Sequence, residues 1–135
     1  MSNARILVVD DEADIRELVQ EILTEEGYSV GVAGTAAEAR AACAGQVPDL
    51  VLLDIWMPDT DGITLLREWQ QTFGAALPVV MMSGHGTVET AVEATRLGAL
   101  DYVEKPLSLA KLLRTVRSAL EEGGRRRQPA RNIVP

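Results

Sequence analysis

The sequence predicts an α/β fold, in which a doubly wound parallel sheet carries helices on both faces. Three apolar runs, ILVV (residues 6–9), LVLL (residues 50–53) and VVMM (residues 79–82), are continuous and do not alternate with polar residues. Such runs are typical of strands buried on both faces. Segments of helical periodicity separate them, and strict β-α alternation indicates right-handed crossovers between parallel strands.

Two less apolar segments complete a predicted sheet of five strands. YSVGVA (residues 28–33) follows the first helical segment, and DYVE (residues 101–104) precedes the last one. Because they are less apolar than the three central runs, we expect both at the edges of the sheet.

Local signals mark the first two of five predicted helices. Gly27 stands where the first helix should end, and Thr35 and Glu38 of TAAE have the spacing of a capping box at the start of the second. The apolar residues of the first helix lie on one face at i, i+3, i+4, i+7 and i+8: Ile15, Leu18, Val19, Ile22 and Leu23.

The other three helices are predicted over residues 63–72, over residues 88–97 between Thr87 and Gly98, and after Ser108. The last one carries a single apolar stripe of Leu109, Leu112, Leu113, Val116 and Leu120. From Gly123 onward the pattern is lost. We therefore predict one domain over residues 1–122, followed by a flexible basic tail or the start of an interdomain linker over residues 123–135.

Composition indicates an acidic protein of the cytoplasm. The 135 residues have a formal charge of −7, and all 20 acids lie within residues 1–122, so the predicted domain should not bind nucleic acid by itself. Cys43 is the single cysteine, which excludes an internal disulfide, and we expect it to be a small apolar residue on a helix. The apolar runs are too short for a signal peptide or a membrane span.

Polar residues stop four of the predicted strands. The first strand stops at Asp10 and Asp11, the third at Asp54, the fourth at Ser83, and the fifth is followed by Lys105. Ligands of open parallel sheets bind at the carboxyl ends of the strands, so these side chains should meet at one edge. An aspartate after a single strand is often only a turn residue or a helix cap, but here four strand ends agree.

A cation explains this clustering of carboxylates. Two carboxylates about 4 Å apart repel by about 4 kcal/mol at an effective dielectric constant near 20, so a group of them needs a positive charge. Their hard oxygen ligands suit Mg²⁺, with Mn²⁺ as the alternative ion. A divalent cation, an ammonium and a hydroxyl together can hold a phosphoryl group.

One of the carboxylates is predicted to be the phosphoryl acceptor. No GxxxxGK or GxGxxG loop occurs, so the usual cradle for a nucleotide is missing. A carboxylate can attack phosphorus to form an acyl phosphate. Asp54 is the best candidate, because it is central and is followed by IWMPDTDG.

As an ordered set, the motifs VVDDE, LVLLDIWMPDTDG, MMSG and EKP resemble those of response-regulator receiver domains from bacterial two-component systems, from Arg5 to about Glu122. The resemblance implies a flavodoxin-like fold with strand order 2-1-3-4-5. It also implies that a sensor histidine kinase phosphorylates Asp54, and that Lys105-Pro106 is a cis peptide.

The resemblance also implies the roles of the site residues. Asp11, Asp54 and the backbone carbonyl of Trp56 would bind Mg²⁺, and Asp10 would act through water. Ser83 and Lys105 would bind phosphoryl oxygens. Ser83 and Tyr102 would form the switch, in which the aromatic ring swings inward when the hydroxyl moves toward the phosphate. Glu12 is expected to face solvent as a bystander.

Residues 83–106 look most like the receivers of nitrogen-regulation, sigma-54-dependent activators, and are also similar to the shorter nitrogen-fixation type. This implies an output in transcription regulation, through a DNA-binding domain absent from this chain, and homodimerisation on phosphorylation. The basic tail is better explained as the cut end of a linker than as a nucleic-acid contact. No membrane partner is expected.

Two residues near the site support a sharper hypothesis. Trp56 and His85 should flank the acyl phosphate and influence its attack by water, although a lone loop histidine usually has no special role. Packing explains the spacing of Trp56, Trp69, Met81 and Met82 better than a cofactor box does.

Alternatives remain. A stand-alone receiver would act through protein contacts only. A Mg²⁺ phosphatase of the haloacid dehalogenase type needs an acid where Trp56 stands, and a flavin mononucleotide carrier needs a phosphate loop where this chain has acids. We expect that the protein is not an enzyme and carries out only self-phosphotransfer and autodephosphorylation.

Overall fold

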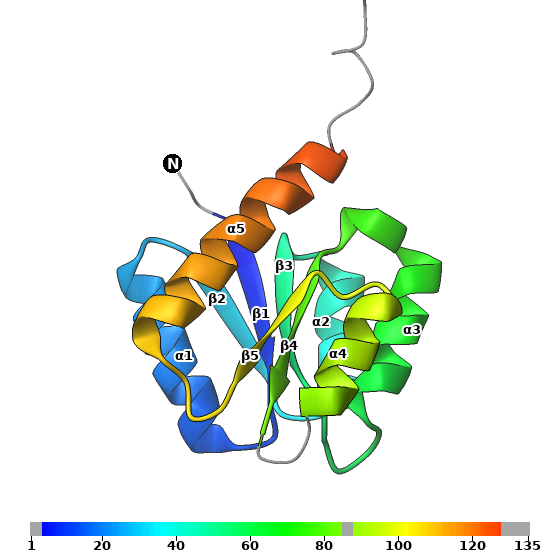
Figure 1. The fold of residues 1–135 in the computed structure, drawn as a ribbon, viewed down its shortest axis with the longest axis horizontal. Coiled ribbons are helices and arrows are strands. Elements are labelled where there is room, and N and C mark those ends of the chain that lie inside the picture. Colours follow the sequence, from blue (N-terminus) through cyan, green and yellow to red (C-terminus); the bar gives the residue numbers. More distant parts are fainter. Residues whose placement is uncertain (1–3, 85–87, 128–135) are drawn as a thin grey trace, which may run out of the picture.

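A computed structural model describes residues 4–84 and 88–127, in which five strands form one sheet flanked by five α-helices (Figure 1). The elements follow in the order β1 (Arg5–Val9), α1 (Ala13–Glu25), β2 (Ser29–Ala33), α2 (Ala36–Gly45), β3 (Leu50–Asp54), α3 (Gly62–Thr72), the short 3₁₀ helix η1 (Gly74–Ala76), β4 (Val79–Ser83), α4 (Val88–Arg96), β5 (Asp101–Glu104) and α5 (Leu109–Arg127). The predicted alternation of strands and helices is confirmed.

The sheet is parallel throughout, with strand order β2-β1-β3-β4-β5, which confirms the flavodoxin-like topology. The two less apolar strands, β2 and β5, form its edges as predicted. In the register, Val9 pairs with both Ala33 and Leu53, and Ser83 pairs with Glu104. The carboxyl ends of the strands are therefore level at one edge of the sheet.

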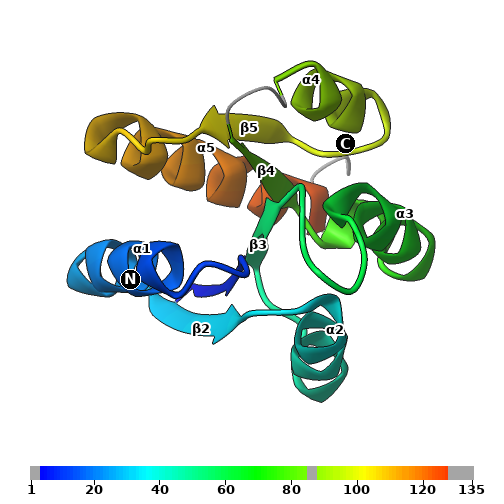
Figure 2. The same ribbon diagram turned by 90° about the horizontal axis from the view of Figure 1, so that it is seen from below.

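Two separate hydrophobic cores lie on the two faces of the sheet. Figure 2 shows α1 and α5 on one face, and α2, α3 and α4 on the other. Because side chains alternate along a strand, Ile6 and Val8 pack with α1 and α5, whereas Leu7 and Val9 pack on the opposite face. This two-sided burial explains the continuous apolar runs.

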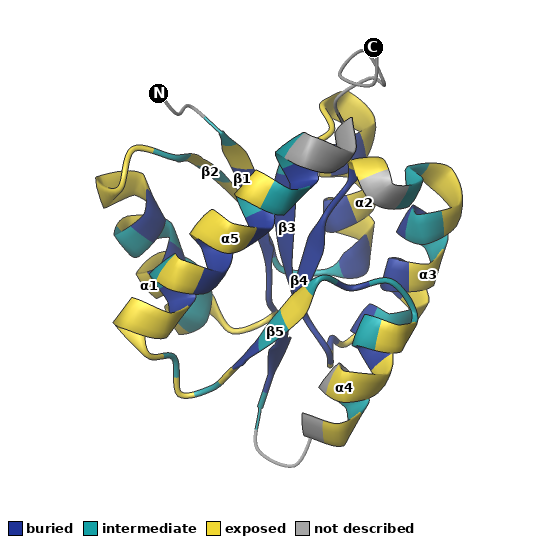
Figure 3. Cartoon of the chain, turned by 45° about the horizontal axis from the view of Figure 1, so that its top comes forward, coloured by how far each residue is buried: buried dark blue, intermediate teal, exposed yellow. Residues whose placement is uncertain are grey.

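Burial decreases from the central strands of the sheet to its edges (Figure 3). Every residue of β3 and β4 is buried, including Met81 and Met82, whereas most residues of the edge strands β2 and β5 are at least partly exposed. Cys43 is buried on α2 and Trp69 on α3, so packing accounts for both, as expected. Of the helices in the described ranges, none combines the length and the apolar character needed to span a bilayer.

The predicted helix signals are partly confirmed. Gly27 follows α1 with φ 97°, a conformation that glycine adopts without the steric cost of a side chain. Thr35 accepts a hydrogen bond from the Glu38 N–H at 3.1 Å, but the Glu38 carboxylate accepts from the Gly34 N–H, at 2.7 Å, and not from Thr35. The expected capping box is therefore only half formed. Thr87 lies outside the described residues.

The last helix, α5, is longer than the sequence pattern indicated. It continues to Arg127, beyond residue 122, where the helical pattern was expected to end. A glycine inside a helix costs about 1 kcal/mol relative to alanine, so Gly123 and Gly124 weaken the helix without ending it, and Gly123 is buried. The helix therefore runs into the segment predicted as a tail or linker. That assignment stays a prediction, and residues 128–135 lie outside the described part of the chain.

Candidate functional site

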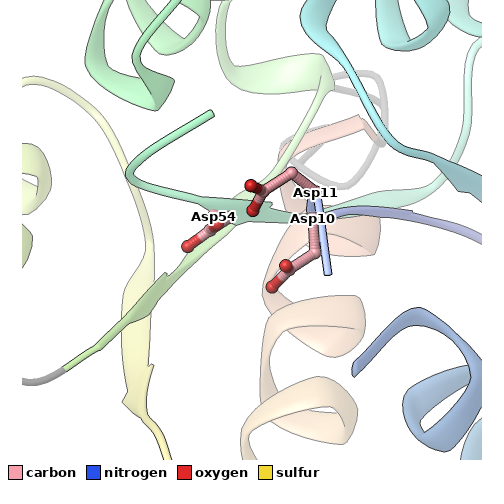
Figure 4. A group of neighbouring side chains, drawn as sticks. All are labelled: Asp10, Asp11 and Asp54. Carbon is pink, nitrogen blue, oxygen red and sulfur yellow. The ribbon is translucent and has the colours of Figure 1, made fainter. Parts of the chain in front are cut away.

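The residues that stop the strands meet at the carboxyl edge of the sheet. Asp10 directly follows β1, Asp54 ends β3, Ser83 ends β4, and Lys105 directly follows β5. Figure 4 shows Asp10 and Asp11 beside Asp54. One carboxylate oxygen from each of these three residues lies within 4.8 Å of the other two. The clustering that the sequence predicted is therefore present.

Burial makes this cluster costly. Asp10 and Ser83 are fully buried, and Asp54 is 6% exposed. Charged groups are rarely buried unless they are paired. Lys105 supplies the pairing, since its Nζ lies 2.6 Å from Asp10 Oδ2 and 3.4 Å from Asp54 Oδ1. One ammonium thus faces several carboxylates, and the site keeps an excess of negative charge.

Glu12 belongs to the site, although its sequence position suggested a bystander. Its side chain is 61% exposed, as expected, but Oε1 lies 3.3 Å from Lys105 Nζ. Its backbone N–H also donates a hydrogen bond to Asp10 Oδ1 at 2.9 Å. The description as a bystander is therefore wrong. The contact joins residues 93 positions apart, so no local pattern could have indicated it.

The charges of the site change the protonation of its groups. Burial, followed by the negative charge of Asp10, raises the pKa of Asp54 to about 7, although Lys105 opposes the shift. Burial would lower the pKa of Lys105, but its hydrogen bond to Asp10 and the charge of Asp54 outweigh burial and raise that pKa. Burial and the neighbouring acids thus disfavour the charged form of Asp54, and a bound cation would favour it.

Two observations fit a cation and a phosphoryl group at this edge. The three carboxylates offer the hard oxygen ligands that Mg²⁺ prefers. The Oγ atom of Ser83 is buried and has no hydrogen-bond partner within the described residues. Because a buried hydroxyl is normally paired, this atom fits a hydrogen bond to a phosphoryl oxygen. The ligand role expected for the Trp56 carbonyl stays a prediction.

The site opens into a cleft of about 560 Å³. Trp56 is 59% exposed and lines this cleft. Its position beside Asp54 agrees with the place expected for it, whereas its effect on hydrolysis stays a prediction. His85, the other residue of that hypothesis, lies outside the described residues. The cleft is lined by Asp11, Glu12, Ile15, Asp54, Trp56, Gly84, Lys105 and Pro106.

The start of α3 packs against the backbone of the proposed acceptor. The Gly62 N–H donates to the Ile55 carbonyl at 2.5 Å. A side chain on residue 62 would collide with the carbonyl oxygen of Asp54. Gly62 is thus required by close approach, a role that the spacing of DTDG alone did not assign.

The loop after Asp54 also reaches α2. Asp59 accepts hydrogen bonds from the N–H groups of Ala36, at 3.0 Å, and Ala37, at 3.1 Å, and these bonds lower the pKa of Asp59. The carboxylate therefore sits at the N-terminal end of a helix more than 20 residues away in sequence, where the helix dipole favours negative charge. Sequence spacing did not indicate this contact.

The predicted switch residues lie on paired strands. Met81 of β4 pairs with Tyr102 of β5, and the Lys105 N–H donates to the Ser83 carbonyl at 2.8 Å. Tyr102 is half-buried and packs against the core that α2, α3 and α4 cover. The Lys105-Pro106 peptide is cis, as the resemblance implied.

The comparisons with known proteins point to one family. Residues 6–117 match the response regulator receiver domain. The chain is 46% identical to the nitrogen assimilation regulatory protein NtrX of Azorhizobium caulinodans over 122 residues, or 86% of this chain and 26% of that protein. It is 42% identical to the transcriptional regulatory protein ZraR of Escherichia coli K12, over 87% of this chain and 26% of that protein.

Solved structures agree with this match. The crystal structure of NtrX from Brucella abortus in complex with ADP superposes with a TM-score of 0.89 at 47% identity, over 93% of this chain and 29% of that one. The receiver domain of the same NtrX gives a TM-score of 0.82 at 49% identity, over 86% of this chain and 98% of that one. The chain spans about a quarter of the length of the curated relatives it matches.

Proposed function

Since the chain belongs to the response regulator receiver domain family, we propose that Asp54 accepts a phosphoryl group from a sensor histidine kinase in the bacterial cytoplasm, with Mg²⁺ bound beside it. The observation that carries this proposal is the set of groups around Asp54. Its carboxylate lies at the open cleft, beside Lys105 and within 4.8 Å of carboxylate oxygens of Asp10 and Asp11.

The chemistry follows from these groups. A carboxylate oxygen of Asp54 forms a bond to phosphorus, while the bond between phosphorus and the imidazole nitrogen of the kinase breaks and the leaving imidazole keeps the electron pair. Lys105 balances part of the incoming charge of about −1.5 to −2. The Ser83 hydroxyl donates a hydrogen bond to a phosphoryl oxygen.

Asp10, Asp11 and Asp54 are the residues that would hold Mg²⁺. When bound, the ion supplies positive charge to the transferring phosphoryl oxygens. Asp10 is buried beneath Lys105, whereas Asp11 is exposed toward the cleft, so Asp11 and Asp54 present the accessible oxygens. The resemblance implies Asp11 and Asp54 as ligands too, together with the Trp56 carbonyl, and gives Asp10 a role through water.

The same arrangement supports a switch. The Ser83 hydroxyl, which has no partner among residues 4–84 and 88–127, would gain one in a phosphoryl oxygen. Ser83 is also joined through the backbone to the end of β5, the strand that carries Tyr102. Binding that favours one position of the β4 end therefore favours one position of Tyr102. We propose that this conformational bias changes the surface that other proteins or a second copy of the chain recognise.

The output that fits best is transcription regulation. NtrX and ZraR are named as regulatory proteins, and about three quarters of their length lies outside the part that this chain matches. DNA binding would then belong to such a further region. We propose no external substrate, since each chain would take up one phosphoryl group on itself and later hydrolyse it. A receiver that acts through protein contacts alone has the same site and differs only in its output.

Intact-mass analysis after incubation with acetyl phosphate tests the proposal. We expect the parent protein to gain one phosphoryl group when Mg²⁺ is present and none in EDTA, and the Asp54→Asn variant to gain none. Glu17→Gln, an exposed acid on α1, is the matched control and should label like the parent. Labelling that persists in Asp54→Asn or that ignores Mg²⁺ would overturn the assignment, and repeated turnover of p-nitrophenyl phosphate would favour the phosphatase.

A further inference from the structure

The side chain of Arg16 reaches from α1 back to the first strand end. Its Nη1 donates a hydrogen bond to the backbone carbonyl of Asp10 at 2.7 Å, and the residue is half-buried. Helical side chains point toward the N-terminus of their helix, and Arg16 lies in the first turns of α1, so its guanidinium returns to the turn that carries the acids.

The hydrogen bond from Arg16 adds to three other contacts that hold Asp10 in place. The Asp10 N–H donates to the Ala33 carbonyl at 3.0 Å, Oδ1 accepts from the Glu12 N–H, and Oδ2 pairs with Lys105. The hydrogen bond from Arg16 to the Asp10 carbonyl also links Asp10 to α1. Because Asp10 is fully buried, water cannot replace a lost partner without a change in the turn.

A second segment confines the guanidinium. A side chain on Gly34, in the loop between β2 and α2, would place its Cβ 2.9 Å from Arg16 Nη1 and 3.4 Å from Arg16 Cζ. The loop is itself fixed, because the Gly34 N–H donates to the Glu38 carboxylate at 2.7 Å. Arg16 thus lies between the Asp10 carbonyl and the Gly34 loop, and in its present position it leaves too little room for a side chain on residue 34.

We propose that Arg16 is a positioning residue for the divalent cation. By fixing the backbone at Asp10, it sets the orientation of the next peptide and hence of the Asp11 carboxylate, the exposed member of the cluster. This inference rests on the proposed Mg²⁺ site. Partners that orient metal ligands without touching the metal typically contribute a factor of about 10 to 100 in metal affinity.

The planar fork of arginine suits this role better than lysine does. Its Nη1 bonds the Asp10 carbonyl, and Nη1 and Cζ of the same planar group are the atoms that a Cβ on residue 34 would approach. The ammonium of lysine is a compact point charge without a planar face. Arg16→Lys keeps the positive charge but lacks the planar guanidinium, so it should retain only part of the contribution of Arg16 to Mg²⁺ affinity.

The dependence of thermal unfolding on Mg²⁺ concentration tests the proposal, because a ligand that binds only the folded protein raises the melting temperature according to its Kd. We expect Arg16→Ala to raise the Kd for Mg²⁺ about tenfold or more and Arg16→Lys to raise it less. Arg40→Ala, which removes an exposed arginine paired with Glu68, should leave it unchanged. A purely structural role for Arg16 would lower the melting temperature without Mg²⁺ and leave the Kd alone.

A double-mutant cycle adds a sharper test. Gly34→Ala should raise the Kd for Mg²⁺ in the parent, because its Cβ displaces the guanidinium, and should have little further effect in Arg16→Ala, where no guanidinium is present. An Mg²⁺ response in Arg16→Ala equal to that of the parent overturns the inference. So does an equal effect of Gly34→Ala in both backgrounds. If Arg16→Ala does not fold, an unchanged Kd in both Arg16→Lys and Gly34→Ala overturns it. A parent protein that shows no response to Mg²⁺ overturns the proposed function instead.

Discussion

The replacement of Asp54 by asparagine is expected to stabilise the protein in the absence of metal, and to do so more at alkaline than at acidic pH. The folded-state pKa of Asp54 is raised from 3.8 to about 7 by burial and by the charge of Asp10. Between these values the unfolded chain loses the proton and the folded protein keeps it. The free energy of unfolding therefore falls as pH rises from about 4 to about 7, and the full penalty is present above that range.

The magnitude follows from the size of the shift. About 3 units at about 1.4 kcal/mol each correspond to a penalty of at most about 4 kcal/mol near pH 8. The same arithmetic leaves about 1 kcal/mol near pH 4.5. Asparagine does not ionise, so Asp54→Asn should escape the penalty. A domain of this size gains about 4 °C in melting temperature per kcal/mol, so the stabilisation near pH 8 should be easily measured.

Urea and thermal unfolding in EDTA, near pH 8 and near pH 4.5, measure this difference. Glu17→Gln changes an exposed acid and should stay within about 0.5 kcal/mol of the parent at both pH values. An Asp54→Asn variant that is no more stable than the parent near pH 8, or equally stabilised at both pH values, would refute the reasoning. Added Mg²⁺ should stabilise the parent more than Asp54→Asn, because the variant lacks one ligand charge.

Three further predictions concern residues around the acceptor. Gly62→Ala should lower the free energy of unfolding by about 1 to 3 kcal/mol in urea titrations, since its Cβ collides with the Asp54 carbonyl, and a variant as stable as the parent would contradict this. Lys105→Met should slow labelling by acetyl phosphate at least about tenfold in intact-mass time courses, because no ammonium then balances the incoming charge, and an unchanged rate would exclude that role. Trp56→Ala should shorten the lifetime of the phosphorylated protein by opening the cleft to water, and an equal lifetime would end that idea.

The parts of the site that the sequence predicts are those that depend on the strands alone. Continuous apolar runs identify buried strands, and a parallel sheet necessarily brings their carboxyl ends to one edge. Asp10, Asp54, Ser83 and Lys105 each stand at such an end, so their meeting follows from local pattern plus topology. The metal and phosphoryl roles needed the further argument that clustered carboxylates require a cation.

The parts that the sequence does not predict depend on how helices and loops approach the strand ends. Arg16 reaches back from the first turns of α1 to the Asp10 carbonyl, and Asp59 reaches the start of α2 from the loop after Asp54. Glu12 contacts Lys105, a residue that is distant from it in the sequence. The predicted end of the last helix at residue 122 was wrong for another reason. The low helix propensity of glycine is a weak preference, and the burial of Gly123 overrides it.

The hydroxyl of Ser83, for which the described part of the chain offers no partner, also bounds the gain of the proposed switch. An unpaired buried polar group costs about 1 to 3 kcal/mol, so a phosphoryl oxygen that pairs with it changes the ratio of two conformations by a factor of about 5 to 150. A complete reversal from 1:99 to 99:1 needs about 5.5 kcal/mol. From a resting ratio of about 1:99, pairing with Ser83 alone would leave a measurable fraction of phosphorylated molecules in the resting conformation. A complete reversal would also have to draw on Lys105 or on contacts between molecules.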